Sequence, residues 1–179
     1  YTEAISVFSQ ASRLFDYDMD VVSEAQIWMM RAYTELGWFT DADGLSEALK
    51  MRALPKNLEN DFNEFYTHLL IRKGDYAEAI PHLAESIKNQ SNNLQKQRFR
   101  FLLGQLYAEI DDKSNAYAAF ENLKGVNTPY EITFNALMQQ SQVSAGSDQR
   151  KILSDLIKMA KSTKNSEFLD QIYYAIGNI

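Results

Sequence analysis

Lys73-Gly74-Asp75-Tyr76-Ala77-Glu78-Ala79-Ile80 is the stretch of sequence that decides the fold of this chain. A Gly-Asp turn is followed by an aromatic residue, and a small residue comes three positions after the aromatic one. Turn residues that separate two helix-forming segments predict the corner of a helical hairpin. The methyl group of Ala79 would let the two helices of that hairpin approach closely.

The same pattern recurs along the whole chain. Its small or aliphatic position lies at spacings of 38, 37, 37 and 37 residues, at Ala4, Ala42, Ala79, Ala116 and Leu153. A steady period near 37 is typical of a solenoid of stacked hairpins. The period is slightly longer than the roughly 34 residues of the tetratricopeptide repeat (TPR).

A second recurring position holds glycine inside a helical pattern. Gly104 is followed three residues later by Tyr107, as in the first helix of a TPR, and Gly177 lies 73 residues further on. Glycine inside a helix costs about 1 kcal/mol relative to alanine, so we expect close helix packing at both glycines. The other repeat markers are Phe8, Gly74, Tyr76 and Phe120.

These patterns predict an all-α fold, specifically a TPR-like α-solenoid, which is a right-handed superhelix of antiparallel helical hairpins. Apolar residues at helical spacing predict ten helices. They span about 1–15, 20–36, 39–53, 57–73, 76–89, 93–110, 113–124, 129–143, 148–162 and 165–179. The chain is expected to be a single array with repeats at 20–53, 57–89, 93–124 and 129–162. Half repeats at 1–15 and 165–179 predict a fragment of a longer array.

Composition narrows the range of functions. The net charge is −6 among 179 residues, which disfavours binding to nucleic acid. The absence of cysteine excludes disulfides, thiolate metal sites and cysteine catalysis. No apolar run approaches the roughly 20 residues that span a bilayer, so no direct membrane span is expected.

Catalytic and metal-binding motifs are not evident in the sequence. His68 and His82 lie on different predicted helices, without a second ligand at metal spacing. Residues 16–20 resemble the start of a calcium loop, but Val21 and Ile27 stand where that loop requires Gly and Glu. A helix-capping turn is the better interpretation of this segment. We therefore predict no enzyme activity, no cofactor and no metal site.

The predicted binding surface is the concave groove that the first helix of each hairpin would line. Counting from Gly74 and Gly104 gives the candidate residues Arg31, Thr34, Glu35, Asp61, Glu64, His68, Arg72, Arg98, Phe101, Gln105 and Glu109. Three of them, Arg31, Arg72 and Arg98, could hold carboxylates of a peptide by paired hydrogen bonds. The alternative, that these residues form an ordinary solvated face, stays open.

Three stretches resemble a particular group of TPR proteins, at residues 98–107, 128–136 and 169–179. They are similar to the large TPR lipoproteins of Bacteroidetes, the SprE/PorW group linked to gliding motility and type IX protein secretion. The resemblance implies a lipid anchor upstream, a location on the periplasmic side of the outer membrane, and assembly with other proteins of the cell envelope.

Three functional hypotheses follow from the sequence. The first is a non-catalytic scaffold for protein–protein interaction within a cell-envelope lipoprotein assembly. The second is a soluble, cytoplasmic module that binds an extended tail or a helix in its groove. The third is a docking segment of a multidomain enzyme. The complete gene would separate them, by a lipoprotein signal, a short cytosolic reading frame or a catalytic domain.

Overall fold

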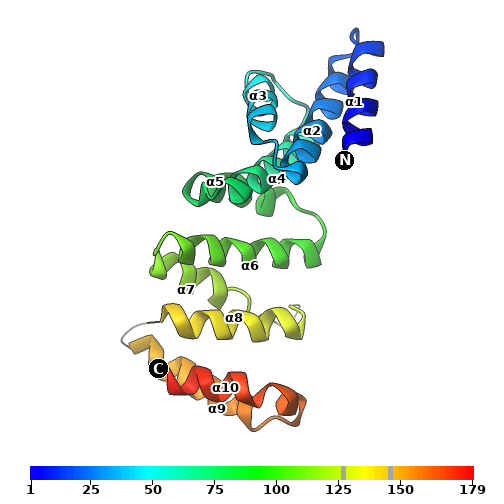
Figure 1. The fold of residues 1–179 in the computed structure, drawn as a ribbon. Helices are drawn as coiled ribbons and strands as arrows, with labels where there is room; N and C mark the ends of the chain where they lie inside the picture. The colour runs from blue at the N-terminus through cyan, green and yellow to red at the C-terminus, as the bar shows by residue number, and fades with distance from the viewer. Residues whose placement is uncertain (126–127, 145–146) are drawn as a thin grey trace. The chain divides into compact units, whose positions relative to one another are not determined.

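The computed structural model describes residues 1–125, 128–144 and 147–179. Within these residues the chain forms ten α-helices and one short 3₁₀-helix, η1, and no β-strand (Figure 1). The prediction of an all-α fold is confirmed. The helices are α1 (Thr2–Leu14), α2 (Met19–Leu36), α3 (Phe39–Lys50), α4 (Lys56–Lys73), α5 (Tyr76–Asn89), α6 (Asn93–Glu109), α7 (Lys113–Glu121), α8 (Tyr130–Val143), α9 (Ser147–Ala160), η1 (Thr163–Phe168) and α10 (Leu169–Gly177).

The last predicted helix begins later than expected. The prediction starts it at residue 165, whereas residues 163–168 wind into η1 and α10 begins only at Leu169. Asn165 is buried, and its side-chain amide donates to the carbonyl oxygen of Met159 at 2.8 Å. This contact ties η1 back to the end of α9. Residues 145–146 of the predicted repeat 129–162 lie outside the described residues.

The corner predicted at residues 73–76 ends α4 in a left-handed residue. Gly74 has φ +87°, and its N–H and that of Asp75 donate to carbonyl oxygens in the last turn of α4. Glycine adopts this conformation without steric cost. The same pair of hydrogen bonds follows α2 at Gly37 and α6 at Asp111, with φ of +75° and +58°. Left-handed corners therefore recur 37 residues apart.

Residues 1–89 form one compact unit. In it α2 packs against α1, α3 and α4, while α4 packs against α3 and α5. Each of these helices thus contacts the next one, and α2 also contacts the helix after next. The largest fully buried side chains of this unit are Ile27, Met30, Leu49, Leu69, Leu70 and Leu83.

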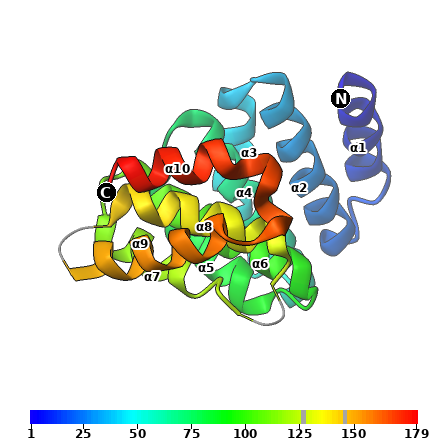
Figure 2. The same ribbon diagram turned by 90° about the horizontal axis from the view of Figure 1, so that it is seen from below.

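Residues 90–179 form the second compact unit. Its helices follow one another in chain order from α6 to α10, and α6, α8 and α10 run in the same direction (Figures 1 and 2). α8 packs against α6, α7, α9 and α10. One buried cluster contains Ala116, Phe120, Leu123, Ala136 and Val143, and a second contains Phe134, Leu137, Ile152, Leu156, Ile172 and Ala175.

The predicted small positions lie where helices cross. Ala42, Ala79 and Ala116 are each 0% exposed. A Cβ atom added to Gly104 would lie only 2.5 Å from Cε1 of the fully buried Phe120. These four positions therefore lie in closely packed parts of the structure. Among the other markers, Ala4, Phe8, Tyr76 and Tyr107 are half-buried, and Gly74 is exposed at its turn.

Two markers are wrong. Leu153 is only half-buried, whereas Ile152 and Leu156 are 0% exposed, so the buried face of α9 begins one residue earlier than predicted. Gly177 is exposed, and a Cβ atom added there would meet nothing within 4 Å. It ends α10 without a close crossing.

Candidate functional site

Three of the predicted groove residues in the first unit gather around the carboxylate of a fourth, Glu35. Arg31 Nε lies 3.0 Å from it, His68 Nε2 3.2 Å and Arg72 Nη1 3.6 Å. Arg31 and Glu35 come from α2, whereas His68 and Arg72 come from α4, so the contacts tie these two packed helices together. Two of the three arginines predicted to hold a ligand carboxylate, Arg31 and Arg72, already hold one from the chain itself.

Burial and charge act in opposite directions in this cluster. Burial alone would raise the pKa of Glu35, but the hydrogen bond from Arg31 and the nearby positive charges leave it below its usual value. Burial and the charge of Arg31 lower the pKa of His68, which outweighs the attraction of Glu35. His68 therefore lies beside Glu35 as a neutral imidazole at neutral pH.

Aromatic rings support the same face. The Arg31 guanidinium lies 5.1 Å from the centroid of Phe65, and Trp28 packs edge-on to Phe65 at 4.8 Å. Thr34, by contrast, is 0% exposed, and its hydroxyl donates to the carbonyl oxygen of Met30 at 2.8 Å. The prediction that Thr34 lines an open groove is wrong, because it points to the opposite side of α2 from the solvent.

Asp61 and Glu64 differ from Glu35 in lacking a counter-ion. Both are half-buried, and burial raises the pKa of each. The charge of Asp61 raises the pKa of Glu64 further, and Arg31 offsets only part of this. Within the ranges that the structure describes, neither carboxylate forms an ion pair. These two carboxylates could therefore pair with a basic group of a partner.

The predicted groove residues on α6 fall into two groups. Arg98 and Glu109 are exposed and Gln105 is half-buried, so all three have surface to offer a partner. The ring of Phe101 instead lies 5.6 Å from that of Phe120 and packs against the buried cluster of α7 and α8. Its assignment to an open groove is wrong, because its ring fills the contact between α6 and α7.

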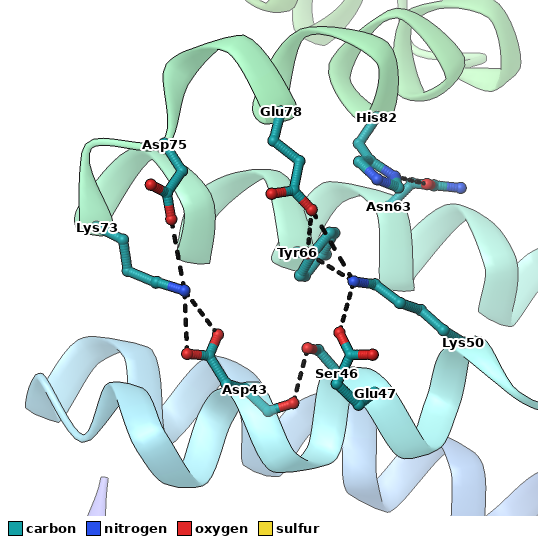
Figure 3. A network of polar contacts seen from close by, with 10 residues as sticks. All are labelled: Asp43, Ser46, Glu47, Lys50, Asn63, Tyr66, Lys73, Asp75, Glu78 and His82. Carbon is teal, nitrogen blue, oxygen red and sulfur yellow. Dashed lines mark hydrogen bonds and ion pairs between the residues drawn. The ribbon is translucent and has the colours of Figure 1, made fainter.

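Figure 3 shows a polar network that the sequence analysis missed. Lys50 Nζ of α3 donates to the Tyr66 hydroxyl of α4 at 2.7 Å, and that hydroxyl donates to Glu78 of α5 at 2.7 Å. Nearby, Lys73 lies 3.0 Å from Asp43, which links the end of α4 to α3. The network fastens α3 to the following hairpin.

Tyr66 and His82 could suggest acid–base chemistry, but their environments oppose it. Burial raises the pKa of Tyr66 despite the nearby Lys50, so the phenol keeps its proton. Burial and Lys50 lower the pKa of His82. Asn63 Nδ2 donates to the carbonyl oxygen of Glu59, and Asn63 Oδ1 accepts a hydrogen bond from His82 Nδ1–H at 2.7 Å. These groups hold helices together and are not activated.

Glu121 is the centre of a polar cluster in the second unit, here called the hub. Its carboxylate lies 2.8 Å from Lys124 Nζ and 2.5 Å from Lys151 Nζ, and the fully buried Gln140 donates to it at 2.7 Å. Burial would raise the pKa of Glu121, but these hydrogen bonds outweigh it and lower the pKa to about 2. The hub joins α7, α8 and α9.

A groove that was not predicted lies between α8 and α10. It has a volume of about 1010 Å³. Met138, Ser141 and Gln142 line it from α8, and Gln171, Tyr174 and Asn178 line it from α10 or the residue after it. In the predicted hairpin scheme, α8 and α10 are the first helices of successive hairpins.

Sequence offered one usable signal for these sites. Arg31 and His68, Glu35 and Arg72, and Trp28 and Phe65 are each 37 residues apart, which is one repeat. The groove residues Ser141 and Asn178 share that spacing. Residues one period apart meet across adjacent first helices, so pairing charges by the period would have found the Glu35 cluster.

Comparison with known proteins does not identify the chain. No protein-family model matches it, and neither a curated protein nor a solved structure matches it. Among the described residues, no group of three or more His, Asp or Glu side chains is placed to hold a metal ion. No helix in those same ranges is long and apolar enough to cross a bilayer.

Proposed function

We propose that this chain is a non-catalytic protein-binding array, whose hairpins stack as a TPR-like, right-handed solenoid. The 37-residue recurrence of left-handed corners at Gly37, Gly74 and Asp111 supports equivalent hairpins. Contacts within each unit support the stacking, because first helices pack on one another as well as on their own second helices. Such an arrangement leaves one face of the first helices open.

The groove between α8 and α10 is the observation that carries the proposal. A cavity of about 1010 Å³ lies at the upper end of ligand-site volumes of roughly 300–1,000 Å³. Apart from Asp170 it is lined by uncharged polar and apolar side chains, and it lies between α8 and α10, which the predicted hairpin scheme makes first helices. Tyr66 and His82, the residues that most resemble an acid–base pair, have no activated group to offer.

The test compares variants on first helices with variants on second helices. The intact chain is immobilised, and partner proteins from the source cells are captured and quantified. Gln142→Ala on α8 and Arg98→Glu on α6, both exposed, should reduce capture while leaving the melting temperature unchanged. Lys88→Glu on α5 and Lys113→Glu on α7, both exposed, are the controls. Loss of capture with the controls but not with the first pair would refute the proposed binding face.

The proposed setting is a scaffold of a cell-envelope lipoprotein assembly. It is supported by the resemblance of residues 98–107, 128–136 and 169–179 to TPR lipoproteins, and the soluble peptide-binding module is the alternative. Cell fractionation with an antibody against this chain separates the two. Release into the soluble fraction after lysis, without detergent, would favour the module over the scaffold.

A further inference from the structure

We propose that a pocket between α3, α4 and α5 binds a free α-amino acid with an apolar side chain, whose carboxylate and ammonium are held by Arg52 and Glu59. This function goes beyond protein binding, because the pocket has a volume of about 350 Å³, near the lower end of the roughly 300–1,000 Å³ of small-molecule sites. All its lining residues belong to the first compact unit, and none of them is part of the Glu35 cluster.

Arg52 supplies a positive charge that the protein does not pair. This half-buried side chain follows the end of α3, and its Nη1 donates to Ser23 Oγ at 3.2 Å and to Gln26 Oε1 at 2.7 Å. These two oxygens are uncharged, and they hold the guanidinium in place. Among the described residues no carboxylate pairs with Arg52, and no acceptor takes its Nε or Nη2 hydrogens. That edge of the guanidinium matches the two oxygens of a carboxylate.

Glu59 supplies the opposite charge. It is exposed in the first turn of α4 and forms no ion pair in the part of the chain that the structure describes, although Arg52 lines the same pocket. The other charged residue of the lining, Lys50, is already engaged, since its Nζ lies 2.8 Å from Glu47 and 2.7 Å from the Tyr66 hydroxyl (Figure 3). One open charge of each sign favours a zwitterion, because a simple anion would leave Glu59 uncompensated and a cation would do the same to Arg52.

The buried part of the lining is largely apolar. Leu49 is 0% exposed and Phe62 is 6% exposed, and the half-buried Leu54 lines the pocket with them. Removing a hydrocarbon side chain from water against such a surface is favourable. The apolar lining therefore selects an amino acid such as leucine or phenylalanine over a polar one.

His82 offers the ligand's ammonium a second acceptor. Its Nδ1–H donates to Asn63 Oδ1 at 2.7 Å, and burial and the charge of Lys50 lower the pKa of the ring. The imidazole is therefore neutral at neutral pH, and its Nε2 keeps a lone pair. No group in the described ranges donates to that nitrogen. Both charged groups of an amino acid thus meet complementary groups in one pocket.

The experiment titrates the intact chain with leucine and phenylalanine by isothermal titration calorimetry. Leucinamide lacks the carboxylate and isocaproate lacks the ammonium, so each should bind at least about tenfold more weakly than leucine. Arg52→Gln should reduce the preference for leucine over leucinamide, and Glu59→Gln should reduce the preference for leucine over isocaproate.

Matched controls carry the same substitutions outside the pocket. Arg13→Gln and Glu131→Gln both change exposed residues, and Glu131 lies in the first turn of α8 as Glu59 does in that of α4. Both controls should bind leucine as tightly as the unsubstituted chain.

Three outcomes would overturn the inference. They are no binding of either amino acid, an analogue that binds as tightly as leucine, and both preferences unchanged in Arg52→Gln and Glu59→Gln. Because Arg52→Gln also removes the contacts from Arg52 to α2, its folding is checked by circular dichroism. If that variant does not fold, Glu59→Gln and the two analogues decide the question, since they leave these contacts intact.

Discussion

Replacing Gly104 with alanine tests the close crossing of α6 and α7 at Phe120. The new Cβ atom would lie 2.5 Å from Cε1 of Phe120 and 2.8 Å from its Cδ1 and Cζ. Phe120 cannot swing aside easily, because it is 0% exposed and packs among Ala116, Leu123 and the ring of Phe101. To restore ordinary contact near 3.4 Å, the ring or α6 must move by about 1 Å.

Two opposing free energies decide the result. Alanine gains about 1 kcal/mol over glycine inside a helix. Overpacking a well-filled core costs about 1–3 kcal/mol. The net change for Gly104→Ala is therefore a destabilisation of up to about 2 kcal/mol, which is a large part of a typical domain's stability. Gly44 provides the control, because it lies inside α3 and a Cβ atom added there would meet nothing within 4 Å.

The assay is urea unfolding followed by circular dichroism. Gly44→Ala should stabilise the protein by about 1 kcal/mol, and Gly104→Ala should not. In a Phe120→Leu background the Cε1 and Cζ atoms are gone, so Gly104→Ala should then recover its helix-propensity gain. A coupling free energy of about 1–3 kcal/mol between the two sites is expected. If Gly104→Ala stabilises the wild-type chain as much as Gly44→Ala does, the crossing has room and the packing argument fails.

Three further predictions follow from single contacts. Ala116→Leu should overpack the α7 crossing and cost about 1–3 kcal/mol in unfolding free energy, whereas Ala118→Leu, on the exposed side of α7, should change little. Asp18→Ala should cost about 1 kcal/mol, since Asp18 accepts from the N–H groups of Asp20 and Val21, and equal loss with Asp16→Ala would contradict this. Glu121 stabilises the folded chain above its usual pKa of 4.5, and this contribution should disappear as the pH falls towards about 2. In Glu121→Gln the free energy of unfolding should depend less on pH in the acid range. An unchanged dependence would contradict the stabilising role of the Glu121 contacts.

Helix positions follow closely from the sequence, because turn chemistry and apolar spacing are local signals. The corner at Gly74 and the capping turn at Asp18 were both predicted. The first is formed by backbone groups and the second by a side-chain carboxylate and backbone N–H groups, in each case close in sequence. The corner at Asp111 has the same left-handed conformation without a glycine, because Asp tolerates this conformation better than most residues. Local structure of this kind needs no knowledge of the tertiary contacts.

Helix faces follow less closely, because they depend on how neighbouring helices rotate. The stripe counted from Gly74 placed Arg72 and His68 on one surface correctly. A shift of one residue made Leu153 a marker instead of Ile152, which turns the side chain by about 100° around α9. The wrong prediction for Thr34 has the same cause, because Thr34 is adjacent to Tyr33 and Glu35 yet faces the core. A sequence repeat fixes the period but leaves such one-residue offsets undetermined.

The two candidate surfaces, the Glu35 cluster and the α8/α10 groove, differ in how many of their polar groups already have partners within the protein. That difference indicates their roles. A ligand carboxylate at Arg31 and Arg72 would displace Glu35, whose side chain is only 19% exposed, and would leave its charge poorly compensated. Little free energy would be gained by that exchange, so the Glu35 cluster serves chiefly to hold α2 against α4. At the α8/α10 groove, carboxamides exchange only water for ligand. Recognition belongs where polar groups are left free, and internal ion pairs belong where helices must be held together.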